Sequence, residues 1–283
     1  MNLKNKILYN LTEKIILKNK KFKGIHKGES CYLFGNAKSL KYYDLSLFND
    51  RISIGCNALS LHKDFSKIGI SYYYEGHPFN FYKFFKDPYT SSYRRHILGD
   101  LKKQKIRENS DINFFLDVSD YPSTRGKNIF YSHHFGEKFS NYSNCSLDGF
   151  FSANQSALSG MIGMAIYFGF NKITLVGCDH LMRPRSSDHF FEYGEMLKII
   201  HPGFVNEEVL VAAQEFVSLE VVTPNSEYKG DLIPHVSYED LTGKEAVYRE
   251  NYEIVLDDDL ITLSECSYPY LMTKSQFLKN SVL

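Results

Sequence analysis

The chain has 283 residues, 43% of them hydrophobic and 23% charged, so it can bury a sizeable core and is not intrinsically disordered. Its 33 Lys and Arg residues equal its 33 Asp and Glu residues, which argues against a protein that binds nucleic acid by neutralising phosphates. Its five scattered cysteines contain no Cys-x-x-Cys pair, which favours a reducing compartment and disfavours a zinc site. Without a long apolar span or a signal-peptide core, we expect a cytoplasmic protein.

The first 28 residues are basic, with eight lysines against one acidic residue, Glu13. Such a segment can rest on an anionic membrane surface, at roughly 1 kcal/mol for each cation near the surface. The alternative is a solvated helix docked on the body through its apolar side chains, which are Ile7, Leu8, Leu11, Ile15 and Ile16.

The region from Ser30 onward reads as the opening of a parallel sheet. Residues 31–35 are a short apolar run ending in glycine, which predicts a buried strand. Residues 38–47 predict a short helix, and residues 51–59 a second buried strand that ends near Asn57. Residues 69–74 predict a third strand.

The next region, residues 79–150, carries weaker patterns, with a helix expected over 94–107 and a strand over 129–133. A nearly all-apolar helix is predicted over 156–170, where small residues indicate close packing. A buried strand follows over 173–180. A late helix and strand are expected over 207–218 and 219–222.

These elements predict an α/β fold: one Rossmann-like, mostly parallel sheet with helices on both faces, with a small lid or insertion region. The expected organisation is a basic N-terminal helix or tail over 1–28, a nucleotide-binding domain over 29–245 and a C-terminal extension over 246–283.

Ligands of parallel α/β sheets bind beyond the carboxyl ends of the strands. The residues expected there are Gly35, Asn36, Ser39, Asn57, Glu75, His77, Asp179 and His180. The first turn has a single glycine and matches neither the GxGxxG fingerprint nor a Walker loop. Its backbone N–H groups could still face a nucleotide phosphate. The equally weighted alternative is that this turn is an ordinary loop that binds no ligand.

Two stretches, GESCYLFGNAKSLKYYDLSLFNDRISIGCNAL and SALSGMIGMAIYFGFNKITLVGCDH, resemble the bacterial lipooligosaccharide sialyltransferases with their GNGPSL-type loop. HKGES and TPNSEYKGDLIPHVSYEDL are similar to related polysaccharide-cluster proteins. A pterin diphosphokinase family and flagellin-modifying glycosyltransferases share parts of this signature. The resemblance covers about half of the chain and implies a GT-A-like arrangement of the fold.

The resemblance implies roles for several residues. Asn36 and Ser39 match the loop that holds the donor's phosphate and sugar, and Asn57 matches an asparagine that contacts the cytidine nucleotide. Asp179 matches the aspartate at a strand end. Ser156 falls where the family has Thr-Ser-Gly near the donor, although the glycine comes later here.

The family's tyrosines that stabilise the leaving phosphate are replaced here by His180 and Leu181, so the resemblance leaves that role to Arg183 and Arg185, whose guanidinium groups pair with phosphate oxygens. The family's general base is a histidine before the late helix. His201 occupies about that place and His189 is the second candidate, with a structural role as the alternative for either one.

Residues 257–259, Asp-Asp-Asp, resemble the metal-binding DxD of other glycosyltransferases. They lie outside the matched region, and we interpret them as a solvated acidic turn at a strand end. The resemblance implies a CMP-activated sugar as donor substrate and no need for a metal, so we predict no metal and no cofactor.

The predicted function is transfer of sialic acid or a related nonulosonic acid from its CMP-activated form to a glycan or glycolipid acceptor. The alternatives are transfer of another activated sugar, transfer of diphosphate to a pterin, and a non-catalytic nucleotide-sugar-binding scaffold. The expected partners are the donor and the acceptor, without nucleic acid. Peripheral contact with the inner membrane and homo-oligomer formation are left open.

Overall fold

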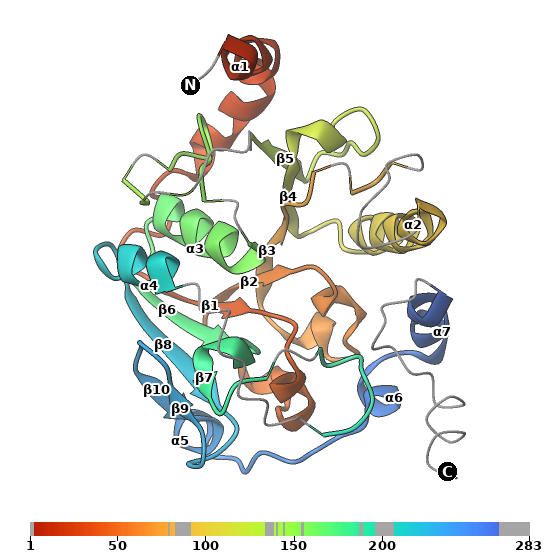
Figure 1. Ribbon diagram of the computed structural model, residues 1–283, viewed down its shortest axis with the longest axis vertical. Helices are drawn as coiled ribbons and strands as arrows, with labels where there is room; N and C mark the ends of the chain where they lie inside the picture. Colours follow the sequence, from red (N-terminus) through yellow and green to blue (C-terminus); the bar gives the residue numbers. More distant parts are fainter. Residues whose placement is uncertain are drawn as a thin grey trace.

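The computed structural model describes residues 3–78, 80–82, 92–133, 139, 141–143, 145–153, 156–186, 189–195 and 207–265. An eight-stranded sheet crosses the molecule in the order β10-β8-β6-β1-β2-β3-β4-β5, and every neighbouring pair in it is parallel (Figure 1). The α/β fold with a parallel sheet is therefore confirmed.

The strands of this sheet are β1 Ser30–Phe34, β2 Ile52–Cys56, β3 Ile70–Glu75, β4 Asn113–Asp117, β5 Ile129–Ser132, β6 Lys172–Val176, β8 Ser218–Thr223 and β10 His235–Ser237. A small antiparallel pair joins β7 Met182–Arg183 to β9 Lys229–Gly230. The α-helices are α1 Leu3–Ile16, α2 Ser92–Glu108, α3 Ala157–Phe168, α4 Glu207–Gln214, α5 Tyr238–Thr242, α6 Asn251–Ile254 and α7 Asp257–Glu265. Short 3-10 helices include η1 Leu17–Phe22, η2 Lys38–Tyr42, η3 Leu45–Leu47 and η6 Val118–Asp120.

Both faces of the sheet are buried, because successive side chains of a strand point to opposite faces. Leu33 of β1 joins the core layer that α3 and α4 cover. Phe34 joins the layer on the other face, covered by η2, η3 and the helices α2, α5, α6 and α7. Burial on both faces explains why β1, β2 and β6 are nearly continuous apolar runs.

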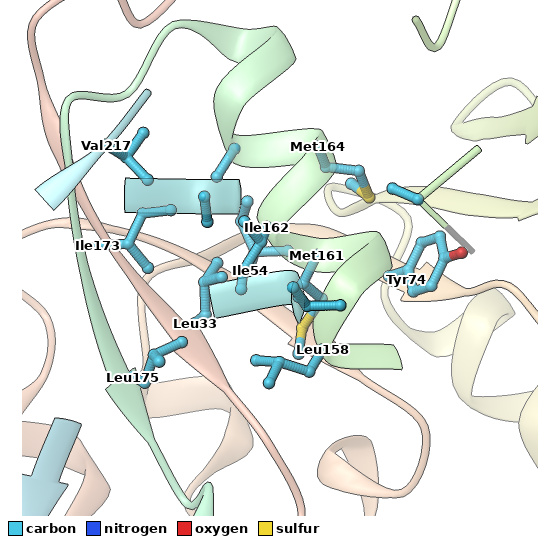
Figure 2. Packing of buried hydrophobic residues seen from close by; sticks show 14 of the residues in the cluster. Leu33, Ile54, Tyr74, Leu158, Met161, Ile162, Met164, Ile173, Leu175 and Val217 are labelled. Carbon is cyan, nitrogen blue, oxygen red and sulfur yellow. The ribbon is translucent and has the colours of Figure 1, made fainter. Parts of the chain in front are cut away.

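Helix α3 packs onto the middle of the sheet through Leu158, Met161 and Ile162 (Figure 2). A Cβ atom at Gly160 would lie 2.3 Å from the Tyr74 ring, and one at Gly163 would lie 2.7 Å from the Cβ of Ala153. Because real Cβ atoms do not approach so closely, the two glycines let α3 sit directly on β3 and on the loop before α3. This confirms the close packing expected from the small residues of the sequence.

Some local expectations were wrong. Residues 38–47 form the 3-10 helices η2 and η3 in place of one short helix. Strand β4 was not predicted, although its residues Phe114, Phe115 and Leu116 are fully or almost fully buried. The acidic triplet 257–259 begins helix α7 and is not a turn at the end of a strand. Carboxylates are favoured there by the partial positive charge of a helix N-terminus.

The segment expected to be a C-terminal extension contributes to the core as far as it is described. Ile254, Val255 and Leu263 are buried in the layer under β1 and β3, and Val255 forms a β-bridge with His62. Asp259 of α7 pairs with Lys105 of α2 at 3.2 Å, which fastens this segment to the body.

Candidate functional site

The candidate site lies where the sheet changes direction. From β1 the chain builds β2, β3, β4 and β5 on one side, and then returns to place β6 on the other side of β1. Ligands of open parallel sheets bind at the carboxyl ends of the strands that flank such a point. The loops after β1 and β6 therefore frame the candidate site, and the loop after β2 lies beside them.

The loops after β1 and β6 are bonded to one another. The N–H of Gly35 donates to the carbonyl of Val176 at 2.8 Å, and the N–H of Ala37 donates to the carbonyl of Gly177 at 3.0 Å. A Cβ at Gly35 would lie 2.2 Å from the Gly177 oxygen, so only glycine permits this approach. Since these two amides are engaged within the protein, the expectation that they face a phosphate needs correction.

Ser39 and Asp179 form a second link between the same two loops. The backbone N–H of Ser39 donates to Oδ2 of Asp179 at 2.8 Å across 140 positions of sequence. Both residues are fully buried. The structure thus brings these two predicted residues together, but in this conformation they hold the loops in place and do not face solvent.

Two predicted asparagines are partly exposed at this edge. Nδ2 of Asn36 donates to the carbonyl of Cys56 at 3.1 Å, which orients its carboxamide across the ends of β1 and β2. Asn57 follows β2 with a φ of 51°, a left-handed conformation that asparagine tolerates better than most residues. The hydroxyl of Tyr73 donates to the Asn57 carbonyl at 2.8 Å and holds this conformation. Either carboxamide can offer a donor and an acceptor to a bound nucleotide.

His189 lies against the β1 loop. Residue 189 forms an antiparallel bridge with Ala37, and the N–H of Phe190 donates to the Asn36 carbonyl at 3.0 Å. Nδ1 of His189 lies 3.0 Å from Oε1 of the buried Glu192. The imidazole is 42% exposed, so it is accessible to a substrate. A carboxylate at Nδ1 favours the tautomer with its proton there, which makes Nε2 the basic nitrogen.

Arg183 and Arg185 both pair with Asp231, which follows β9. Nε of Arg183 lies 2.7 Å from Oδ1 of Asp231, and a terminal nitrogen of Arg185 contacts the other oxygen. The two guanidinium groups thus share one carboxylate. His180 is uncharged near neutral pH, because burial and the Arg185 charge lower its pKa to about 4.

Three predicted residues remain: His77, Ser156 and His201. His77 is exposed after β3, at the same edge of the sheet. The hydroxyl of Ser156 accepts from the N–H of Ser159 at 3.2 Å and caps α3, so its observed role is structural. His201 lies outside the described residues.

A buried polar cluster beyond β3 and β4 was missed by the sequence analysis, apart from Glu75 as a strand end. Nζ of Lys102 lies 2.6 Å from Oε2 of Glu75, and Asn80 donates to the same oxygen at 3.0 Å. Burial raises the pKa of Asp117 to about 6 and that of Asp120 to about 8. The signal in the sequence was an acidic residue at the end of each of two hydrophobic stretches, Glu75 of β3 and Asp117 of β4, the second of which was not recognised as a strand.

Within the described ranges, no three His, Cys, Asp or Glu side chains come together in a way that could hold a metal ion. No helix in the described part of the chain is both long and apolar enough to cross a membrane. The described cysteines, Cys31, Cys56, Cys145 and Cys178, are free thiols.

Comparison of the chain with family models, curated proteins and solved structures gives no match. The site must therefore be interpreted from its own geometry and from the resemblance of its motifs.

Proposed function

We propose that the protein is a glycosyltransferase with a GT-A-like arrangement that transfers a nonulosonic acid, such as sialic acid, from a CMP-activated donor to a glycan or glycolipid acceptor. One observation carries the proposal. The partly exposed Asn36 and Asn57 lie at the carboxyl ends of neighbouring strands, and a histidine–glutamate pair adjoins the same loop.

In the proposed reaction, an acceptor hydroxyl attacks the anomeric carbon of the donor. The new glycosidic C–O bond forms as the bond from that carbon to the phosphate oxygen breaks, and CMP leaves with the bonding electron pair. His189 accepts the hydroxyl proton at Nε2, and Glu192 holds the ring and stabilises the imidazolium that results. Arg183 is 69% exposed, and Asp231 holds its guanidinium beside that of Arg185, so it is the side chain best suited to contact the leaving phosphate.

Donor binding is tested first, by thermal shift with CMP, UDP, GDP and ATP. We expect CMP to stabilise the protein by about 2.7 kcal/mol at a hundred times its dissociation constant. Asn57→Gly is the informative variant, because glycine adopts the φ of 51° while the carboxamide is lost. It should weaken CMP binding about tenfold, the loss of one to two hydrogen bonds, at unchanged stability. Stabilisation by UDP, GDP or ATP in place of CMP would refute the donor assignment.

Catalysis is tested by CMP release from CMP-sialic acid with a galactose-terminated acceptor. His189→Asn should lower the turnover number about 10²- to 10⁴-fold while leaving CMP binding intact. Glu192→Gln should lower it less and shift its pH profile, as expected of a positioning residue. The control is His235→Asn, at an exposed residue on the edge strand β10. Unchanged turnover in His189→Asn would remove this residue from the role of base.

A further inference from the structure

The helix α1 carries an apolar and basic stripe that the body does not cover. Ile7 is 51% exposed and Leu11 is 73% exposed. These positions are four residues apart, and Lys14 follows three residues later, so all three lie on one side of the helix. On the opposite side, Ile16 is fully buried and fastens the helix to the sheet.

This observation decides between the two interpretations of the N-terminal segment. A helix docked on the body through its apolar residues would cover Ile7 and Leu11 along with Ile15 and Ile16. Of these four residues, Ile15 is partly buried and Ile16 is fully buried, whereas the other two are exposed. The single acidic residue of α1, Glu13, lies on a different side of the helix from the stripe.

More cations lie at the edge of the sheet against which α1 packs. Helix α1 and η1 pack against β5, and a cavity of about 170 Å³ there is lined by Ile15, Lys18 and Arg125 among others. Arg125 also lines a second cavity of about 250 Å³, together with Lys103 and Arg107 of α2. The guanidinium of Arg125 is placed by a bond to the Tyr121 carbonyl at 2.9 Å.

We propose that the stripe of α1, formed by Ile7, Leu11 and Lys14, together with Lys18 and Arg125, is a docking surface for an anionic lipid membrane. Exposed apolar side chains between cations are typical of helices that lie in the membrane interface with the apolar side inserted. The cations match the negative headgroups, and the two cavities can accept lipid phosphates. Nucleic acid would match the charge but would give Ile7 and Leu11 nothing to insert into. The chain as a whole has no net charge, so the basic character is local to this end.

The full-length protein is tested by flotation with vesicles of phosphatidylcholine mixed with phosphatidylglycerol, against vesicles of phosphatidylcholine alone. We expect binding to the mixed vesicles only. The double variant Lys14→Gln/Lys18→Gln should bind the mixed vesicles about 25-fold more weakly, about fivefold for each cation. Leu11→Asn should weaken binding on the order of tenfold through lost apolar insertion. High salt should abolish the difference that the two lysine substitutions cause, and should leave the loss caused by Leu11→Asn unchanged.

The controls are Lys244→Gln and Val247→Asn. They replace an exposed lysine and a 64% exposed valine in the segment that joins α5 to α6. This segment lies at the opposite end of the molecule from α1 (Figure 1). Both controls should bind like the unaltered protein, and circular dichroism should show that all variants are folded.

Three outcomes would overturn the proposal: equal binding to uncharged vesicles, unchanged binding of Leu11→Asn, or tighter binding to RNA than to the mixed vesicles. A dimer in solution that Leu11→Asn dissociates, without vesicle binding, would assign the stripe to a second copy of the chain. The test does not depend on the proposed glycosyl transfer, because it measures no turnover and alters no residue of the candidate site.

Discussion

Asp120 is a carboxyl group that the fold keeps away from water. It ends η6 beyond β4 and is fully buried, and its Oδ1 accepts from the N–H of Phe81 at 3.2 Å. Within the described part of the chain its Oδ2 has no hydrogen-bond partner. Burial, with the carboxyl groups of Asp117 and Glu75 nearby, raises its pKa from 3.8 to about 8.

The sign of the effect on stability follows from which state holds the proton. In the unfolded chain Asp120 loses its proton near pH 4, whereas in the folded protein it keeps the proton up to about pH 8. Between these values the folded state binds more protons, so the free energy of unfolding falls as the pH rises. At about 1.4 kcal/mol for each pH unit, the loss reaches at most about 4 kcal/mol at neutral pH.

Asp120→Asn should remove this loss. The asparagine keeps an oxygen to accept from Phe81, and its NH₂ group replaces a protonated oxygen. We expect the variant to equal the unaltered protein near pH 4 and to exceed it in stability by up to about 4 kcal/mol near pH 7. Urea unfolding followed by circular dichroism over this pH range measures the difference.

The matched control is Asp111→Asn, at an exposed aspartate that precedes β4. Its free energy of unfolding should vary with pH in parallel with that of the unaltered protein. If Asp120→Asn also gave a parallel curve, the argument from burial would be refuted, because the folded protein would then accept the charge at no cost.

Two further predictions concern packing and acid stability. Gly160→Ala should lower the free energy of unfolding by about 1–3 kcal/mol, because its Cβ would lie 2.3 Å from the Tyr74 ring. Gly149→Ala, whose Cβ would meet nothing closer than 3.6 Å, should cost little in the same denaturation experiment, and equal costs would contradict the packing argument. The unfolded chain protonates His180 below about pH 6.5, whereas burial and Arg185 lower the folded pKa to about 4, so stability falls as the pH drops between these values. His180→Gln should reduce this acid-induced loss of stability by about 1–2 kcal/mol, measured by unfolding at different pH values. The same loss in the variant as in the unaltered protein would contradict the prediction.

The sequence predicted the central part of the sheet because its strands are buried on both faces. Strands β1, β2, β3 and β6 are short apolar runs bounded by turn residues, and such runs need no tertiary information to be recognised. Strand β4 was missed because Asn113–Asp117 lies in a region rich in aromatic and polar residues, where strands and loops have similar composition.

The candidate site was predicted in position but not in detail. Asn36, Ser39, Asn57 and Asp179 do meet at one edge of the sheet, as expected for strand ends. Whether each is exposed depends on contacts that no local pattern contains. The bond between Ser39 and Asp179 spans 140 positions and buries both.

Partners distant in sequence explain the other differences. Asp231 neutralises part of the charge of Arg183 from 48 positions away, which spacing alone cannot reveal. By contrast, Glu192 lies three residues after His189, so its pairing with the imidazole had a local signal that the analysis did not use.

The place of β1 in the sheet has a consequence for synthesis on the ribosome. Its second neighbour, β6, begins at Lys172, so more than half of the chain must be made before β1 is paired on both sides. Until then the nascent protein presents the backbone of Ser30–Phe34 as an open template for other chains. A fragment that stops before Lys172 should therefore aggregate, whereas one that includes β6 should remain in solution.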